Sequence, residues 1–191
     1  MADAVAGIFI CSFKEQSVLL GKRGQMGEPD LDDGTWDYFG GGISSSEDPQ
    51  KGAEREKEEE LRDYFNNDIY YKKTLINTES RKSRSSSKSY IIYHYVYMVE
   101  NESTVPINKF PYNLLSDIEG SSEVIDVKWF PLSTIKNKYD IFPKLHQELV
   151  NGLADKIIEH TKHSPPSTTQ LSQAESILRI MKIYKEKIRN G

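Results

Sequence analysis

The sequence predicts an α+β fold, because strand-like and helix-like segments follow one another along most of its length. Two pairs of apolar runs rich in β-branched residues indicate antiparallel strand pairs, within 4–23 and 69–100. One helix is expected in the middle of the chain, and two more near the C-terminus have apolar residues at helical spacing. We therefore expect one α+β domain with a helical extension at its C-terminal end.

The first hairpin is predicted from AVAGIFICSF and SVLLGKR, with a turn at Lys14–Gln16. A loop rich in Gly, Pro and Asp follows it. The segment WDYFGGGI is expected to carry the backbone through a glycine turn. A helix should then begin near Asp48–Pro49, because Asp48 suits the N-cap and Pro49 suits the first helical position. It should run to about Phe65.

The second strand pair is predicted from IYYKKTLINTES and SYIIYHYVYMVE, with the polar and basic tip RKSRSSSK between them. EVIDVKWFPL indicates a late strand, and STIKN a short helical turn. A helix is expected over 142–163, then a linker and an amphipathic helix from Leu171 to Ile188. We assign residues 1–163 to the main domain and 164–191 to the linker and final helix.

Composition narrows the class of protein. The 191 residues carry a net charge of −4, so bulk attraction to nucleic acid or to anionic lipid is not expected. No apolar run is long enough to span a bilayer, and the N-terminus lacks the features of a signal peptide. Cys11 is the single cysteine, which excludes an internal disulfide and suits a reducing cytoplasm.

An acidic face is predicted on the helix after the glycines. Four acids lie at positions i, i+3, i+4 and i+7, which places them on one side: Glu56, Glu59, Glu60 and Asp63. Like charges at this spacing weaken an isolated helix. Taken alone, the pattern favours a solvated acidic face, and the alternative is a site for a divalent cation with hard oxygen ligands.

The residues around these acids decide between the two interpretations. The spacing of Gly41, Glu47, Arg55, Glu56, Glu59 and Glu60 resembles the Nudix box, G-x5-E-x7-R-E-U-x-E-E-x-G-U, in which U is a bulky aliphatic residue. The chain departs from this pattern at Lys57, Arg62 and Asp63, and Phe39 replaces a proline before the glycines. Lys57 is expected to lay its stem on the core and to extend its ammonium outward. The resemblance covers about residues 5–140.

The resemblance implies an α/β/α sandwich around a mixed β-sheet. It also implies a metal-dependent hydrolase that cleaves a diphosphate bond in a nucleoside diphosphate linked to a group X. By the same resemblance, Mg²⁺ or Mn²⁺ would be held by Glu56, Glu59, Glu60 and the Gly41 carbonyl. Arg55 would orient the glutamates, and Glu47 would steady the loop before the helix.

The general base stays open between a box glutamate and an acid on a late loop. Glu123 is the late-loop candidate, with Glu119 and Asp126 as alternatives, and for all three an ordinary surface acid is an equal interpretation. Arg23 and Lys22 are candidates for binding phosphate, against the alternative of strand-end surface charges.

Several aromatic and basic residues have two interpretations. Trp36 would line the nucleotide pocket or pack under the glycines. Tyr93, Tyr95 and Tyr97 share one face of a strand, which favours the core over stacking on a base. The basic residues of 81–88 favour a solvated tip over a grip on polyphosphate or nucleic acid.

The first substrate expected is a nucleoside triphosphate, because LLGKRG and GTW resemble the flanks of that branch of the family. The alternatives are an RNA-end hydrolase that uses the basic loop, and a non-catalytic nucleotide-binding module. Nucleic acid is the less favoured partner, and pairing into a homodimer through the last helix stays open.

Overall fold

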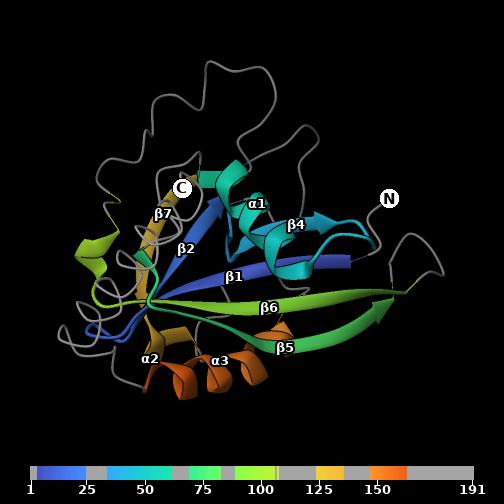
Figure 1. Cartoon of the computed structure of the whole chain (residues 1–191). Helices are drawn as coiled ribbons and strands as arrows, with labels where there is room; N and C mark the ends of the chain where they lie inside the picture. Colours follow the sequence, from blue (N-terminus) through green and yellow to red (C-terminus); the bar gives the residue numbers. More distant parts are fainter. Residues whose placement is uncertain are drawn as a thin grey trace, which may run out of the picture.

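The computed structural model of the protein describes residues 4–24, 34–61, 69–82, 89–105, 107, 124–135 and 147–162 (Figure 1). Within these residues seven strands form one sheet, and helices lie against it. In chain order the elements are β1 Ala4–Ser12, β2 Ser17–Arg23, β3 Trp36–Asp37, β4 Phe39–Ile43, α1 Pro49–Leu61, β5 Lys72–Lys82, β6 Ser89–Val99, η2 Glu102–Thr104, β7 Val124–Pro131, α2 Leu132–Ile135 and α3 Gln147–Thr161.

Strand β1 lies at the centre of a mixed sheet. The residues at its end pair antiparallel with β2, and those at its start pair antiparallel with β4. Along its other edge β1 runs parallel to β6, which in turn pairs antiparallel with β5. Strand β7 pairs with β2 on the outer side. Both predicted strand pairs are therefore confirmed.

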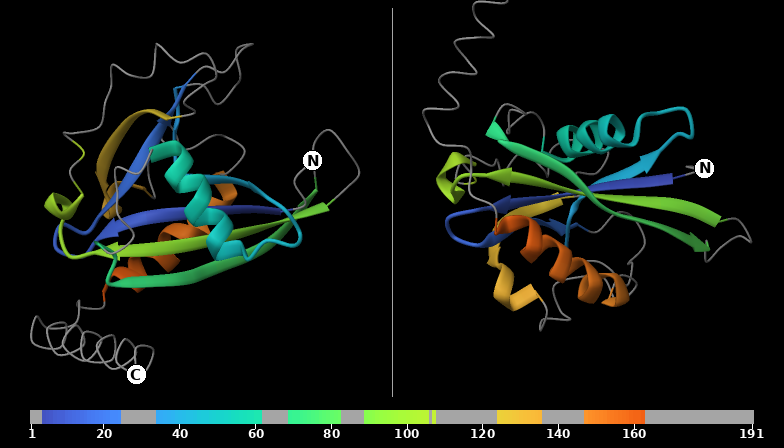
Figure 2. Two further views of the ribbon diagram at one scale, coloured as in Figure 1. Left: turned by 45° about the horizontal axis from the view of Figure 1, so that its top comes forward. Right: turned by 60° about the horizontal axis from the view of Figure 1, so that its bottom comes forward.

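Helices cover both faces of this sheet, as the resemblance implied. Helix α1 lies on one side and α2 and α3 on the other (Figure 2). Successive residues of a strand pack on opposite faces of the sheet, because their side chains point alternately to either side. Ile8 and Ile10 pack in the core under α1, whereas Phe9 and Cys11 pack in the core under α3. The α/β/α sandwich is confirmed.

The glycine segment is a strand rather than the expected turn. Phe39–Ile43 forms β4, and Ile8 lies opposite Phe39 while Ala4 lies opposite Ile43. Gly40 explains the difference, because its φ is +152° and a Cβ there would lie 2.2 Å from the Ala6 carbonyl oxygen. The run of glycines therefore lets two backbones approach closely instead of reversing the chain.

Helix α1 begins where the sequence predicted. The Asp48 side chain accepts a hydrogen bond from the Lys51 backbone N–H at 3.0 Å, which is the N-cap interaction. The structure describes the helix as far as Leu61, so the expected end near Phe65 lies outside the described residues. Lys57 differs from the expectation, because the whole side chain is buried and its ammonium is not extended into solvent.

Two further features follow from the layers. Tyr95 and Tyr97 are buried in the core under α1, and the partly buried Tyr93 packs against that core, as the core interpretation of these tyrosines predicted. None of the described helices has the length and apolarity needed to cross a membrane. The predicted linker and C-terminal helix, 164–191, lie outside the described residues.

Candidate active site

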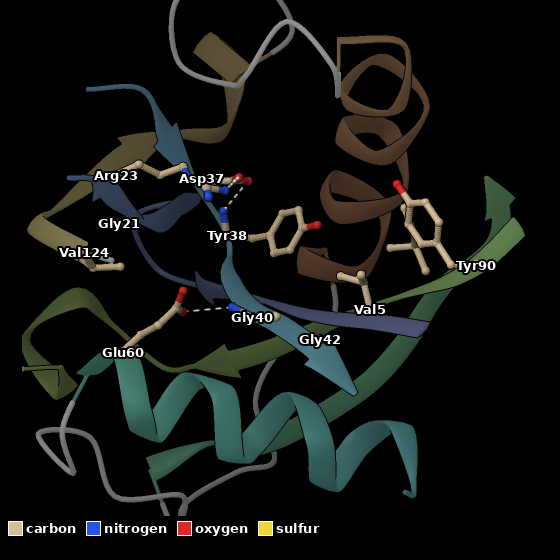
Figure 3. A pocket seen from close by; sticks show the side chains of 12 residues that line it. Val5, Gly21, Arg23, Asp37, Tyr38, Gly40, Gly42, Glu60, Tyr90 and Val124 are labelled. Carbon is tan, nitrogen blue, oxygen red and sulfur yellow. Dashed lines mark hydrogen bonds and ion pairs between the residues drawn. The ribbon is translucent and has the colours of Figure 1, made fainter. Parts of the chain in front are cut away.

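A pocket of about 230 Å³ opens beside β4, near the point where β1 exchanges β2 for β4 as its partner. Its lining comes from both sides of the sheet, since Val124 belongs to the core under α1 and Tyr38 packs against the core under α3. Figure 3 shows Arg23 and Glu60 on one side of β4 and Tyr90 on the other. The lining residues are Val5, Gly21, Arg23, Asp37, Tyr38, Gly40, Gly41, Gly42, Glu60, Tyr90, Ile92 and Val124.

Two glutamates of α1 touch the glycine strand at the wall of this pocket. The Glu60 carboxylate accepts a hydrogen bond from the Gly40 backbone N–H at 2.9 Å (Figure 3). Glu56 lies against Gly41, where a Cβ would come within 2.2 Å of its Oε2 atom. The absence of a side chain at Gly41 therefore makes room for a carboxylate next to the backbone of β4.

Arg55 connects the helix to the loop that precedes it. Its Nε and Nη2 donate to the two carboxylate oxygens of Glu47 at 3.1 and 3.2 Å, and Nη2 also donates to the Gly42 carbonyl at 3.3 Å. Its Nη1 donates to Glu56 at 2.7 Å and to Glu59 at 3.1 Å. A planar guanidinium suits this role because its donors point in fixed directions.

The charges of Arg55 and of the carboxylates around it stabilise one another. Hydrogen bonds from Arg55 hold the pKa of Glu47 below its usual range. Hydrogen bonds to Glu47, Glu59 and Glu56 raise the pKa of Arg55, so the guanidinium stays charged. One guanidinium faces three carboxylates here, with Glu60 close by, so negative charge remains in excess. That excess attracts cations.

The donor chemistry of this wall suits a divalent cation. Carboxylates and backbone carbonyls are the hard oxygen ligands that Mg²⁺ and Mn²⁺ prefer. Nevertheless, across the described part of the chain no three acidic, histidine or cysteine side chains lie close enough together to form a ready metal site. One oxygen of Glu56 and one of Glu59 are bonded to Arg55, and the other oxygen of Glu56 lies against Gly41.

At the mouth of the pocket Arg23 lies 3.5 Å from the Asp37 carboxylate. The other oxygen of Asp37 accepts a hydrogen bond from the Tyr38 backbone N–H at 2.9 Å. The Tyr38 ring lies over Gly7, where a Cβ would come within 2.2 Å of it, and its edge faces the His94 ring. Burial raises the pKa of the Tyr38 hydroxyl, so it stays a neutral hydrogen-bonding group.

The predicted site residues fall into three groups. Gly41, Glu60 and Arg23 line the pocket, and Glu56 lies against Gly41. Within the described part of the chain Glu59 contacts this group through Arg55, and its side chain is 61 % exposed. Lys22 and Trp36 do not line the pocket.

The difference between Arg23 and Lys22 follows from strand alternation, which turns neighbouring residues to opposite faces. Trp36 and Phe130 meet edge to face, at 5.0 Å between ring centroids. Asp126 lies in β7 and is bonded to the Val127 backbone N–H. Glu119 and Glu123 lie outside the described residues, although Val124, next to Glu123, lines the pocket.

Among the lining residues that sequence reasoning missed, three have polar side chains: Asp37, Tyr38 and Tyr90. Tyr90 lies on the face of β6 opposite to Tyr93, Tyr95 and Tyr97. Period-two alternation shows that the two faces differ, but it does not show which face is buried. Asp37 is an acid inside an apolar segment and is nearly fully buried, which is a local signal for a special role.

Comparisons with known proteins agree on one family. A family model of the NUDIX domain matches residues 1–150. A search of curated protein sequences found no match. Among solved structures, a mutT/nudix family protein from Listeria innocua superposes with a TM-score of 0.56, at 19 % identity, over 84 % of this chain and 97 % of its own.

Two other solved structures have the same fold. A bifunctional NMN adenylyltransferase/ADP ribose pyrophosphatase from Francisella tularensis gives a TM-score of 0.55 at 17 % identity, over 82 % of this chain and 42 % of its own. This chain thus spans about two fifths of that protein, which was also solved with AMP and a manganese ion. The NUDIX domain of Shewanella oneidensis NrtR with ADP ribose gives 0.52 at 17 % identity, over 84 % of this chain and 88 % of its own.

Proposed function

The chain belongs to the Nudix hydrolase family, and from this premise we propose that it is a metal-dependent pyrophosphohydrolase. The substrate that we propose is a nucleoside triphosphate or another nucleoside diphosphate linked to a group X. The products are a nucleoside monophosphate and either pyrophosphate or a phosphorylated X. The observation that carries the proposal is the placement of Glu56 and Glu60 against the glycine strand of a pocket that also contains Arg23.

We assign the metal to Glu56, Glu59, Glu60 and the Gly41 carbonyl, with Mg²⁺ or Mn²⁺ as the ion. When bound, such a cation supplies charge neutralisation on the diphosphate and a more acidic water molecule. Arg55 then has two roles, since it holds Glu47 and the Gly42 carbonyl in place and also competes with the metal for Glu56 and Glu59.

Arg23 is the proposed phosphate-binding residue. Its guanidinium reaches the pocket from the end of β2, and its side chain is 41 % exposed, so a phosphate can approach it. Guanidinium groups bind phosphate oxygens through two parallel hydrogen bonds. Asp37 lies 3.5 Å from Arg23 Nη1 and so helps to position the guanidinium. For the general base we keep Glu123 beside a box glutamate.

The substrate class is tested by product analysis. The protein is incubated with nucleoside triphosphates, ADP-ribose, dinucleoside polyphosphates and capped RNA, in Mg²⁺ or Mn²⁺, and the products are separated by chromatography. Pyrophosphate release supports the triphosphate proposal. ADP-ribose is the second candidate, because the Nudix domain of NrtR was solved with that ligand, and it would give AMP and ribose 5-phosphate.

Variants test the site assignment. Glu59→Gln and Glu60→Gln should each lower turnover by about 10²-fold, because a lost ligand weakens charge neutralisation. Glu58→Gln is the matched control, since Glu58 is on the same helix and its charge acts on Tyr70, away from the pocket. Near wild-type turnover in both test variants would refute the assignment. Nucleotide binding without cleavage would favour a binding module, and cleavage of RNA ends alone would favour an RNA-directed enzyme.

The same proposal includes the organisation of the chain. We place the hydrolase domain at residues 1–163 and the linker with its amphipathic helix at 164–191.

Cys11 is a buried, free cysteine, which supports a cytoplasmic location. A small nucleotide is the proposed partner in preference to nucleic acid, and sedimentation of the full chain tests for a homodimer.

A further inference from the structure

A cluster of charged and aromatic side chains lies on the side of α1 that faces away from the pocket. One oxygen of the Glu54 carboxylate accepts hydrogen bonds from the Lys73 ammonium at 2.9 Å and from the Tyr97 hydroxyl at 2.6 Å. Lys73 belongs to β5 and Tyr97 to β6. A single carboxylate of the helix is thus bonded to two strands of the sheet.

Tyr70 extends this cluster under the helix. The Lys57 ammonium lies 5.3 Å from the centre of the Tyr70 ring, and the Tyr70 and Tyr97 rings meet edge to face at 5.1 Å. Lys57 occupies the position where the box motif has a bulky aliphatic residue, and it is fully buried. In this chain, therefore, a charged and aromatic cluster replaces an ordinary apolar contact between helix and sheet.

The geometry of the helix relates this cluster to the pocket. Consecutive residues of an α-helix are 100° apart, so Glu54 and Glu56 point in nearly opposite directions. A rotation of α1 that breaks the contacts of Glu54 would also move the Glu60 carboxylate. That carboxylate accepts a hydrogen bond from the Gly40 backbone N–H, which the rotation would disturb. A hydrogen bond to a carboxylate is short and directional, and so it restricts such a rotation more than apolar packing would.

We propose that Glu54 and Tyr97 are positioning residues, whose hydrogen bond sets the rotation of α1 and thereby the placement of Glu56 and Glu60 beside β4. They do not touch the pocket and act through the helix. The inference rests on the proposed function only where it concerns metal binding and turnover, because the placement of Glu60 is measurable without either.

The first test follows the Gly40 amide by hydrogen exchange in metal-free protein. Tyr97→Phe removes only the hydroxyl, and Glu54→Gln keeps the shape of the side chain. Loss of one hydrogen bond should accelerate exchange at Gly40 by about fivefold. The control is Val96→Ala, a buried residue next to Tyr97 that belongs to the other core. It should lower the denaturation midpoint while leaving Gly40 exchange unchanged relative to its neighbours in β4.

The second test measures Mn²⁺ affinity without substrate, and then kcat and KM. Tyr97→Phe and Glu54→Gln should weaken Mn²⁺ binding by about fivefold and lower kcat to a similar extent, with KM within about twofold of wild type. Val96→Ala should leave the Mn²⁺ affinity unchanged. A loss of Mn²⁺ affinity and kcat in the two test variants, without such a loss in Val96→Ala, distinguishes a positioning role from a general loss of stability.

Exchange of Gly40 at the wild-type rate in both variants would overturn the inference. Equal acceleration in Val96→Ala would also overturn it, because Glu54 and Tyr97 would then act only through stability. A wild-type protein that neither binds Mn²⁺ nor cleaves any nucleotide would refute the proposed function, and the Gly40 measurement would still decide the inference about positioning.

Discussion

Two adjacent glycines in β4 should respond in opposite ways to the same substitution. At Gly41 an added Cβ would lie 2.2 Å from Glu56 Oε2, the end of a flexible side chain. At Gly40 it would lie 2.2 Å from the Ala6 carbonyl oxygen and 2.6 Å from the Gly7 Cα, both in the backbone of β1, and Gly40 also has a φ of +152°. The first clash is relieved by moving a carboxylate, whereas the second requires two strands to separate.

The expected sizes follow from these contacts. In Gly41→Ala the Glu56 carboxylate must move by about 1 Å to reach an ordinary contact distance, which should cost under about 1 kcal/mol of unfolding free energy. A displacement of that size at a reacting site costs about 10²-fold in kcat. Gly40→Ala combines backbone strain with overpacking and should cost about 2–5 kcal/mol.

Urea denaturation and steady-state kinetics on both variants test this reasoning. Gly152→Ala is the control, because nothing lies within 4 Å of a Cβ at that exposed helical position, and it should leave kcat unchanged. Wild-type kcat in Gly41→Ala would show that the Glu56 position does not matter for turnover. Equal destabilisation in Gly41→Ala and Gly40→Ala would show that the clash at Gly41 is not absorbed by a side chain.

Three further predictions concern Arg55, Asp48 and Tyr71. Arg55→Lys should lower kcat by about 10²-fold, because an ammonium lacks the planar fork that holds Glu47. It should change the unfolding free energy by under about 1 kcal/mol, because the ion pairs of Arg55 are partly exposed. Unchanged kinetics would contradict the role given to Arg55. Asp48→Ala should cost about 1 kcal/mol in urea denaturation through loss of the N-cap, and a cost near zero would argue against it. Burial raises the pKa of Tyr71 to about 12 from a usual value of 10. Its contribution to stability is therefore present below pH 10 and is lost as pH rises toward 12, so Tyr71→Phe should lose less stability than wild type between these pH values; equal losses would refute the assignment.

The acidic helix illustrates what local pattern can predict. Its start at Asp48 and the common face of Glu56 and Glu60 depend on spacing along one helix, and the structure shows both. The strand pairs were equally accessible, because each consists of neighbouring segments with a short connection.

The glycine strand illustrates what local pattern missed. Three glycines have no side chains to indicate a strand, and only the pairing of β4 with β1 shows why they are needed. Lys57 also differs from the expectation, since it is buried and its ammonium lies 5.3 Å from the centre of the Tyr70 ring, a contact outside its own helix. Similarly, Tyr90 enters the pocket because β6 runs parallel to β1, a pairing that no local signal specifies.

The sequence by itself determined the two strand pairs, the start of α1 and which acids share a helix face, because helix and strand periods are properties of consecutive residues. Tertiary structure alone decided that Glu60 meets the Gly40 amide, that Arg23 and Tyr90 line one pocket, and that Glu54 accepts a hydrogen bond from Tyr97. These contacts join segments far apart in the chain. Their geometry depends on how the sheet and helices pack, which no spacing within a single segment specifies.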